Sequence, residues 1–311
     1  MPADSRPGDV GARLPLVYAV ILNSNRRADT LACLSSLRSS TYGRLKVVLL
    51  DNDSTDGSVS AVHSQFPEVE CLPLERNEGY AGNNNIGIQV ALDRRADWVW
   101  VLNEDVVVAP DALSQLIAAA DARERIGVLG PTVYHHDEPD IIQSAGGILG
   151  DGWSTSHRGQ NEREAGQFSR PETVDWISGC ALLARASALH EVGLLDARFF
   201  YYWEETEWCL RARDAGWAAV HVPAAKIWHK GVRREYAPAP NVTYYSTRNR
   251  LLMMAKHHAP LGVWWKAGTS LGRTLLSWSL RPTWRGKRPH RDAMWQGMWD
   301  FLRQRWGIRP D

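Results

Sequence analysis

Short apolar stretches alternate with helix-like stretches through the first 130 residues, and polar clusters follow the apolar stretches. The apolar stretches have the length and composition of buried parallel strands, and they are residues 16–22, 45–50, 69–74 and 98–102. The polar clusters are residues 23–26, 51–56 and 103–105. Strands that alternate with helices form a parallel sheet, which binds ligands at the carboxyl ends of its strands. The pattern therefore predicts an α/β fold with a nucleotide site at that edge.

Helices and further strands are expected around these parallel strands. We expect Asp29 to cap the first helix, residues 77–87 to form a Gly/Asn-rich turn, and Pro110 to lie in the first turn of a later helix. Residues 135–175 lack a period and are expected to form a substrate-facing loop or hairpin. In the second half, strands are expected at 176–183 and 217–222, with a helix at 204–215 that Gly216 closes.

The net charge of the chain conceals two oppositely charged parts. In total, 36 Lys and Arg stand against 35 Asp and Glu, for a formal charge of +1. Residues 226–311 hold 17 basic and 4 acidic residues, a net charge of +13, and 8 of the 15 Trp, whereas residues 1–225 hold 19 basic and 31 acidic residues, a net charge of −12. We expect residues 231–311 to be a basic, Trp-rich helical region that covers the acidic part, faces an anionic membrane, or does both. No nucleic-acid-binding motif accompanies the basic residues, so nucleic acid is not an expected partner.

Composition and segment lengths narrow the class of protein. The chain is 44% hydrophobic and 23% charged, which excludes a disordered or collagen-like chain. Its four cysteines lack metal-type spacing, so we expect free thiols and a cytoplasmic protein. The longest apolar candidate, residues 259–280, is interrupted by Lys266 and Arg273, so no membrane-spanning helix is expected, and a peripheral position at the inner face of the cytoplasmic membrane stays open. Residues 1–14 are expected to form a flexible tail.

Asn103, Glu104 and Asp105 directly follow an apolar strand. Carboxylates at a strand end can hold Mg²⁺ or Mn²⁺ against a diphosphate, because these ions prefer oxygen ligands. A solvated turn is the alternative interpretation of the same three residues.

Two adjacent glutamates, Glu204 and Glu205, begin an expected helix between aromatic residues. Acidic residues in a first helical turn are favoured by the helix dipole, which is the structural interpretation. Glu207 lies four residues before Arg211, so we expect a structural ion pair there. A carboxylate in partly desolvated surroundings has a raised pKa and can act as a general base, which is the functional interpretation of the glutamate pair.

A histidine, His229, follows the last expected strand. A lone histidine is more often a hydrogen-bonded structural residue than a ligand. Its neutral imidazole can nevertheless complete a metal shell that Asp105 begins.

In this order, these features resemble glycosyltransferase family 2, whose members are inverting enzymes of the GT-A fold, and within it the rhamnosyltransferase-like branch. The resemblance runs from about Leu16 to Met254 and implies a GT-A domain at 15–230, with a nucleotide-sugar half at 15–130 and an acceptor and catalytic half at 131–230. It is carried by six motifs in register, VYAVILNSNRRADTLACLSSL, LLDNDSTDGS, RNEGYAGNNNIG, LNEDVVVAPDAL, DWISGCALLARASALHEVGLLDARFFYYWEETEWCLRARDAGW and VPAAKIWHKG followed by YYSTRNRLLM.

The resemblance implies roles on the donor side of the site. Asp51 would bond the nucleotide base, Asn23 and Arg26 would touch the nucleotide, and Asn85 would lie near the sugar and ribose. Glu104 and Asp105 fill the middle and last positions of the family's metal triplet. His229 matches a histidine that reaches the metal, so a divalent cation (Mg²⁺ or Mn²⁺) is the expected cofactor.

The resemblance also implies roles on the acceptor side. Glu205 stands at the proposed base, where the family usually has Asp, and Glu204 before it stays a rival for that role. The acceptor-side residues implied by the same stretch are Trp176, Gly179 and Trp203. Asp53 and Asn83 replace glycines of the common pattern, and either residue type tolerates a left-handed backbone.

The resemblance implies a dTDP-rhamnose donor, with UDP-hexose and UDP-galactofuranose as alternatives. The implied acceptor is a hydroxyl of a saccharide or of a polyprenyl-linked glycan, and a homo-oligomer stays open. A non-catalytic nucleotide-sugar-binding module on the same fold is a less favoured alternative. An NAD-dependent oxidoreductase is disfavoured because no GxGxxG follows the first strand.

Overall fold

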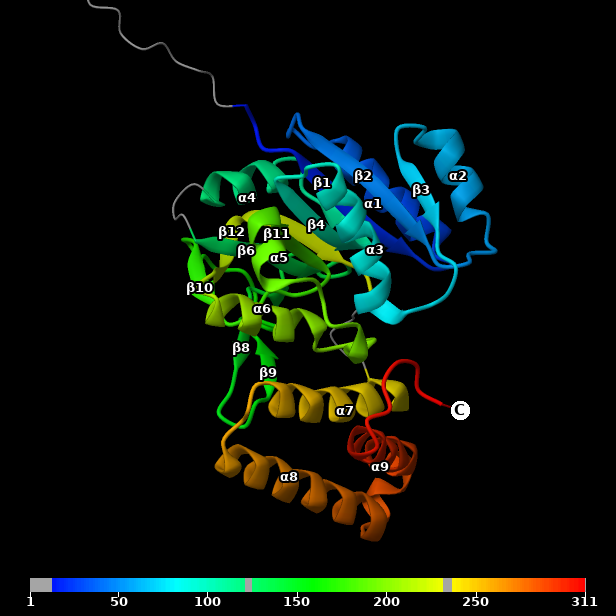
Figure 1. The fold of residues 1–311 in the computed structure, drawn as a ribbon, viewed down its shortest axis with the longest axis vertical. Helices are drawn as coiled ribbons and strands as arrows, with labels where there is room; N and C mark the ends of the chain where they lie inside the picture. The colour runs from blue at the N-terminus through cyan, green and yellow to red at the C-terminus, as the bar shows by residue number, and fades with distance from the viewer. Residues whose placement is uncertain (1–12, 121–124, 232–236, 311) are drawn as a thin grey trace, which may run out of the picture.

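One large sheet with helices on both faces lies above a layer of C-terminal helices (Figure 1). The computed structural model describes residues 13–120, 125–231 and 237–310, so most of the tail expected at 1–14 lies outside the described residues. The strands are hydrogen-bonded in the order β10-β12-β6-β11-β4-β1-β2-β3. Of these eight strands, β10 and β11 run against the direction of the others, so the sheet is mixed but mostly parallel, as predicted.

The N-terminal half of the sheet is parallel and aligns the polar clusters. Its strands are β1 (Val17–Asn23), β2 (Leu45–Asp51), β3 (Glu70–Pro73) and β4 (Trp98–Asn103). The register sets Asn23 opposite Asp51 and Leu22 opposite Asn103. The clusters that follow β1, β2 and β4 therefore meet at one edge of the sheet.

Helices α1 (Arg27–Arg38), α2 (Ser58–Gln65), α3 (Gly79–Asp93) and α4 (Ala112–Ala120) connect these strands. Two local predictions, the helix cap at Asp29 and the turn at 77–87, were wrong. Asp29 lies in the first turn of α1 and does not cap it; the amide of Arg27 instead donates to Asp56, 2.8 Å away.

The segment expected as a turn at 77–87 is helical from Gly79 onward. Asn83 explains this start, because its Oδ1 accepts the amide of Glu78 at 3.0 Å and so satisfies a donor at the helix N-terminus. Asn83 is therefore helical and not left-handed, whereas Asp53 has a φ of 54°, which agrees with its glycine-like position.

The second half of the sheet contains β6 (Ile126–His135), β11 (Ala181–Arg185) and β12 (Ala218–His229), with short strands at its margins. Those strands are β5 (Val106–Val108), β7 (Ile142–Ser144) and β10 (Glu172–Val174). The strand expected at 176–183 begins only at Ala181, because residues 176–180 bend to meet the helix α3 side of the site. A hairpin of β8 (Gly147–Leu149) and β9 (Thr155–His157) extends toward the C-terminal helices (Figure 1).

A strained loop leads into the glutamate helix. After α5 (Ala186–Val192) and the short turn η1 (Ala197–Phe199), residues Phe200, Tyr202 and Trp203 all have positive φ. Helix α6 (Glu204–Asp214) follows, and Gly216 closes it with a φ of 84°. Residues other than glycine rarely adopt positive φ angles, so the surrounding structure must hold this loop in place.

The C-terminal region is helical, as predicted, and it packs under α6. It comprises α7 (Pro240–Lys256), α8 (Leu261–Leu280), η2 (Pro282–Lys287) and α9 (Arg288–Leu302). Leu252 and Met253 of α7 share a core cluster with Phe199 and Trp203. Other large apolar side chains here stay exposed, among them Trp265, Leu276, Leu280, Trp295 and Leu302.

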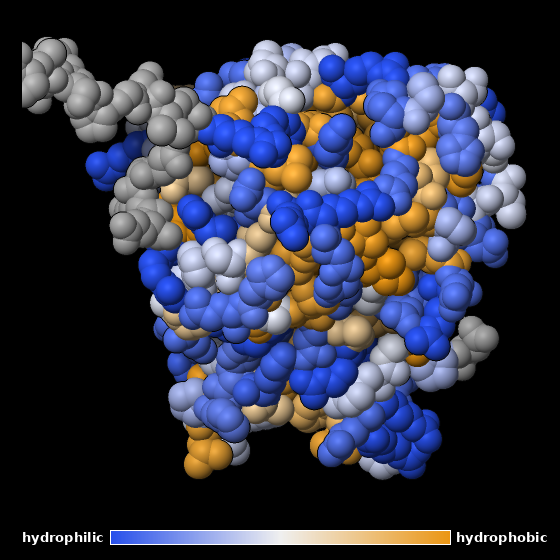
Figure 2. Space-filling view, turned by 45° about the horizontal axis from the view of Figure 1, so that its top comes forward, coloured by the Kyte–Doolittle hydropathy of each residue, from blue (hydrophilic) through white to orange (hydrophobic). Residues whose placement is uncertain are grey.

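Figure 2 shows hydrophobic atoms exposed at the lower end of the molecule, where these helices lie in Figure 1. No helix in the described ranges is long and apolar enough to cross a membrane. All four cysteines are free, as predicted.

Candidate active site

A cavity of about 310 Å³ opens at the polar edge of the sheet. The ends of β1, β2 and β4, the start of α3 and the loop before α6 enclose it, through Leu22, Ser24, Arg26, Asn52, Asn77, Gly79, Tyr80, Asn83, Asn103, Glu104, Asp105, Phe200 and Tyr201. Polar groups thus face three aromatic rings across one hollow. A ligand with both charged and planar parts, such as a nucleotide, fits this lining.

Glu104 and Asp105 form the acidic wall of the cavity, beside Arg26. Arg26 Nη1 lies 3.3 Å from Asp105 Oδ2, and Arg26 Nε lies 3.8 Å from Glu104 Oε1. Burial and the charge of Asp105 raise the pKa of Glu104 to about 7. Burial alone would also raise the pKa of Asp105, but a protonated His229 ring and the Arg26 guanidinium hold it below its usual range. Asp105 is therefore the more fully ionised of the two carboxylates at neutral pH.

His229 faces Asp105 with its Nε2 atom. On the other side of the ring, Nδ1 lies 3.0 Å from Gln143 Oε1, an acceptor, so Nδ1 carries the proton of the neutral ring. Nε2 lies 3.0 Å from Asp105 Oδ1, yet this oxygen is buried without a well-aligned hydrogen bond. Gly231 closes the corner, because a Cβ there would collide with Asp105.

An unpartnered carboxylate oxygen beside a histidine lone pair suits a divalent cation, with Gln143 orienting the ring from behind. Among the residues that the structure describes, no group of three or more His, Cys, Asp or Glu side chains could hold a metal ion. Asp105 and His229 would thus supply two ligands, and phosphate oxygens and water would have to supply the rest.

Asn23 and Asp51 shape the loops beneath the cavity and do not line it. Asn23 is fully buried, and its Nδ2 donates to Asp51 Oδ1 at 2.7 Å and to Ser58 Oγ at 2.8 Å. Asp51 also accepts the amide of Ser54 at 3.1 Å. The neighbouring Asn52 reaches the cavity instead. A direct nucleotide contact by Asn23 or Asp51 therefore stays a prediction.

Asn85 lies on α3 and points away from this cavity. Its amide nitrogen donates to the carbonyl of Leu195 at 2.8 Å, and its oxygen accepts the amide of Leu195 at 3.0 Å. The structure thus does not bring Asn85 to the cavity, and Asn83, four residues after Gly79, lines it in its place.

Glu204 and Glu205 do not line the cavity, but they lie close to Tyr80, which does. The hydroxyl of Tyr80 donates to the carbonyl of Gly179, and the amide of Gly179 donates to the carboxylate of Glu205. Each glutamate has a buried Oε2 atom without a hydrogen-bond partner.

The two glutamates differ in how readily they ionise. Burial and the charge of Glu205 raise the pKa of Glu204 well above its usual range. Burial also raises the pKa of Glu205, but by less, because the backbone amides of Thr206 and Gly179 stabilise its charged form. Glu205 is therefore the member of the pair that ionises first.

Helix α7 fixes the strained loop before these glutamates. Arg248 is fully buried and donates to the carbonyl of Phe199 at 3.0 Å. Asn249 Nδ2 lies 2.8 Å from the carbonyls of Phe199, Tyr201 and Tyr202. The C-terminal region therefore positions both the aromatic lining of the cavity and the start of α6.

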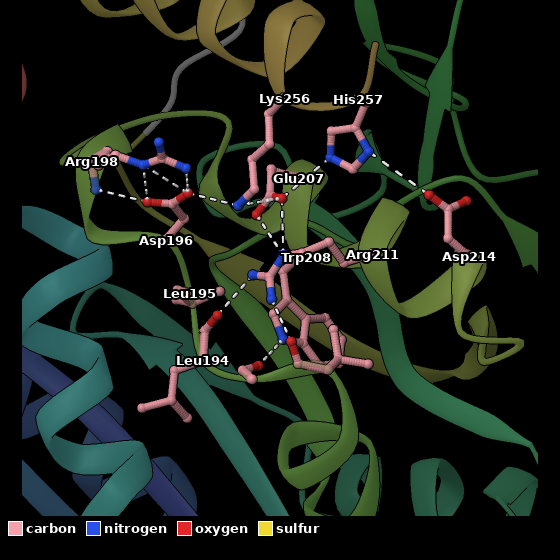
Figure 3. Close-up of polar contacts among 12 residues, drawn as sticks. Leu194, Leu195, Asp196, Arg198, Glu207, Trp208, Arg211, Asp214, Lys256 and His257 are labelled. Atoms are coloured by element: carbon pink, nitrogen blue, oxygen red, sulfur yellow. Dashed lines mark hydrogen bonds and ion pairs between the residues drawn. The ribbon is translucent and has the colours of Figure 1, made fainter. Parts of the chain in front are cut away.

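Glu207 anchors a buried ion network between α6 and α7 (Figure 3). Its Oε1 lies 2.9 Å from Arg211 Nε, 2.8 Å from Lys256 Nζ and 3.2 Å from His257 Nε2, and Lys256 also reaches Asp196 at 2.6 Å. Burial would raise the pKa of Glu207, but these cations hold it at about 2. The predicted structural ion pair with Arg211 is confirmed.

The three acceptor-side residues have different surroundings. Trp176 belongs to the core below the sheet, with its ring 4.9 Å from that of His157, and does not reach the cavity. Gly179 contacts Tyr80 at the cavity wall. Trp203 borders a second cavity, on the side of α7 and α8.

Tyr80, Phe200 and Tyr201 are lining residues that the sequence reasoning did not assign. All three lie inside the quoted motifs, so aromatic residues next to the Gly/Asn stretch and the glutamates were the available signal.

The sequence profile described as Glycosyl transferase family 2 matches residues 18–193, which include most of β1, all of β4 and residues 103–105. The chain belongs to glycosyltransferase family 2. It is a glycosyltransferase that uses a nucleotide-sugar donor. The family assignment agrees with the resemblance that the six motifs carry.

Two relatives and one solved structure are similar to this chain. It is 32% identical over 272 residues to the N-acetylglucosaminyl-diphospho-decaprenol L-rhamnosyltransferase of Mycobacterium tuberculosis, covering 80% of this chain and 83% of the relative. It is 28% identical to a galactofuranosyltransferase of the same organism, covering 93% and 94%. The mannosyltransferase PcManGT of Pyrobaculum calidifontis, solved with GDP-Man and Mn²⁺, aligns with a TM-score of 0.59 at 15% identity, covering 96% of this chain and 90% of that one. The last likeness confirms the predicted GT-A fold.

Proposed function

We propose that this glycosyltransferase moves L-rhamnose from dTDP-rhamnose to a hydroxyl of a saccharide or polyprenyl-linked glycan, with inversion at the anomeric carbon. The reaction type is supported by a pair of carboxylates, Glu204 and Glu205, that follow a strained loop beside the cavity, with Glu205 as the more readily ionised member. The rhamnosyltransferase relative, matched over four fifths of this chain, supports the choice of sugar.

The proposed reaction is one displacement. The acceptor oxygen attacks the anomeric carbon, Glu205 takes the proton of that hydroxyl, and the nucleoside diphosphate leaves with the electrons of the broken C–O bond. Glu204, kept neutral by burial, preserves the shape of the site without adding a second negative charge.

Asp105 and His229 are the proposed ligands of a divalent cation, Mg²⁺ or Mn²⁺. When bound, the cation would neutralise charge on the diphosphate leaving group. The unpartnered Oδ1 of Asp105 and the outward lone pair of His229 support this role. Arg26, 3.3 Å from Asp105, adds a fixed positive charge on the same side.

UDP-galactofuranose and UDP-hexose are the alternative donors, and the galactofuranosyltransferase relative supports the first of them. A panel of nucleotide sugars, screened by thermal shift and by donor hydrolysis with and without Mn²⁺, separates these donors. Stabilisation and turnover with dTDP-rhamnose are expected. Nucleotide-sugar binding without hydrolysis or transfer would instead indicate a non-catalytic binding module.

We propose that the enzyme binds its acceptor at a membrane surface. Exposed Trp265, Leu276 and Leu280 of α8 lie among basic residues, and no Asp or Glu occurs from residue 258 to 291. Basic, Trp-bearing surfaces suit the headgroup zone of anionic bilayers. Flotation with vesicles containing phosphatidylglycerol tests this: binding at low salt is expected, and its absence would leave the helices as a protein cover alone.

A further inference from the structure

A second cavity, of about 420 Å³, lies between the sheet domain and the C-terminal helices. The β8–β9 hairpin contributes Ser154 and Thr155, α7 contributes Ser246 and Arg250, and α8 contributes Ser270 and Thr274. Among the described residues, no Asp or Glu lines it, and apart from hydroxyl groups and Arg250 the lining is apolar, with Trp203, Val242, Leu251, Leu271 and Met294. Hydroxyl groups and one guanidinium therefore form a polar spot that suits an anion inside a largely apolar hollow.

Among the described residues, Arg250 is the only charged side chain in the lining. Its Nη2 donates to the carbonyl of Gly152, while its Nε is buried without any hydrogen-bond partner. No carboxylate among the described residues forms an ion pair with it, and burial lowers its pKa. Arg248, two residues earlier, has its Nε, Nη1 and Nη2 all hydrogen-bonded. An unpaired charge in such a place is costly unless an anion completes it.

The cavity reaches the residue that precedes the glutamate pair. Trp203 borders it and directly precedes Glu204. Helix α8, which forms one wall, exposes Leu276 and Leu280 to solvent beyond the cavity. A ligand held here would thus have an anion at Arg250, one end toward the glutamates and the other toward an apolar surface.

We propose that this cavity binds the diphosphate of a lipid-linked acceptor, with Arg250 as its pairing cation. The guanidinium fork matches phosphate oxygens, and charge-assisted hydrogen bonds of this kind are among the strongest in proteins. The inference rests on the proposed function, because it assigns the acceptor that the same active site would glycosylate. The first cavity remains the site of the donor diphosphate.

Steady-state kinetics on the full chain test the inference with two acceptors. One is N-acetylglucosaminyl-diphospho-farnesol, and the other is an alkyl N-acetylglucosaminide that lacks the diphosphate. R250M should raise the KM for the diphosphate acceptor at least tenfold, leave the donor KM unchanged, and leave the KM for the alkyl glycoside as in the wild type. R250K should restore part of the loss. K46M, which removes an exposed charge from β2, away from both cavities and from the C-terminal helices, is the control and should behave like the wild type.

Binding of farnesyl diphosphate, measured by calorimetry without donor or metal, gives a readout that needs no turnover. R250M should weaken it at least tenfold, whereas vesicles with phosphatidylglycerol should float R250M and the wild type equally. An unchanged KM and unchanged farnesyl diphosphate affinity in folded R250M would overturn the inference. A loss of vesicle binding in R250M as large as its loss of farnesyl diphosphate binding would overturn the inference too, because it would assign Arg250 to lipid headgroups. If no diphosphate acceptor is used at all while farnesyl diphosphate still binds through Arg250, the proposed function fails and the anion site stands.

Discussion

Replacing Glu205 by Gln tests which glutamate is the base. The exchange keeps the shape of the side chain and removes the group that takes the proton. General-base catalysis contributes on the order of 10²–10⁴ in rate, so kcat should fall by that factor, or about 3–5 kcal/mol of barrier. Donor binding should be unaffected, because Glu205 does not line the donor cavity.

The matched control is Glu204→Gln. Burial and the neighbouring charge keep Glu204 protonated, so the variant exchanges one neutral group for another. We expect less than about a tenfold loss in kcat, the scale of one altered hydrogen bond. The pH at which kcat falls on the acidic side of its profile should not change, because burial, and not the charge of Glu204, raises the pKa of Glu205.

The assay is release of nucleoside diphosphate with a saturating acceptor from pH 5 to 9, with donor affinity measured separately by calorimetry. The base must be deprotonated to act, so wild-type kcat should rise with pH through the raised pKa of Glu205, above the usual range of a glutamate. Equal losses in the two variants, or a tenth of wild-type kcat retained by Glu205→Gln, would refute the assignment of the base.

Three further variants probe the metal corner and the ion network. Asp105→Asn should remove the stimulation of turnover by Mn²⁺, and undiminished stimulation would exclude Asp105 as a ligand. Gly231→Ala should do the same through the collision of its Cβ with Asp105, whereas Gly262→Ala, with nothing within 4 Å, should not. Lys256→Met should lower the free energy of unfolding by about 2 kcal/mol at pH 7, measured by urea denaturation. Since the pKa of Glu207 is held at about 2, this difference should shrink as the pH falls from about 4.5 toward 2; a constant difference would contradict the ion-pair account.

The parallel half of the fold could be predicted because its signals are local. Buried strands such as 16–22 and 45–50 are continuous apolar stretches, and the polar residues after them mark where the strands end. The start of α3 was missed because Gly and Asn indicate a turn in isolation. Here the Asn83 side chain accepts the amide of Glu78 across a helical turn, a contact that residue propensities do not register.

The sequence predicted the charged residues of the candidate site better than the residues that line its cavity. Asp105, His229 and the glutamate pair were named from motifs, and the structure brings Asp105 and His229 within 3.0 Å of each other. Asn23 and Asn85 were named on the same basis, yet the side-chain amides of both form hydrogen bonds within the protein, to a loop side chain and to a backbone carbonyl. Position in a motif thus indicated that these residues matter, but not whether they face a ligand or the chain.

The +13 charge of residues 226–311 does not serve mainly to hold the C-terminal region on the acidic part. Among the described residues, the ion pairs that join 237–310 to 13–231 involve Lys256 and His257 alone. The rest of the contact uses carbonyl groups, bound by Arg248 and Asn249, and apolar packing. Most basic side chains are therefore left at the surface or, in the case of Arg250, in a cavity without an acid. Because the same helices fix the loop that leads to Glu205, a surface that meets an anionic acceptor is joined directly to the catalytic end of α6.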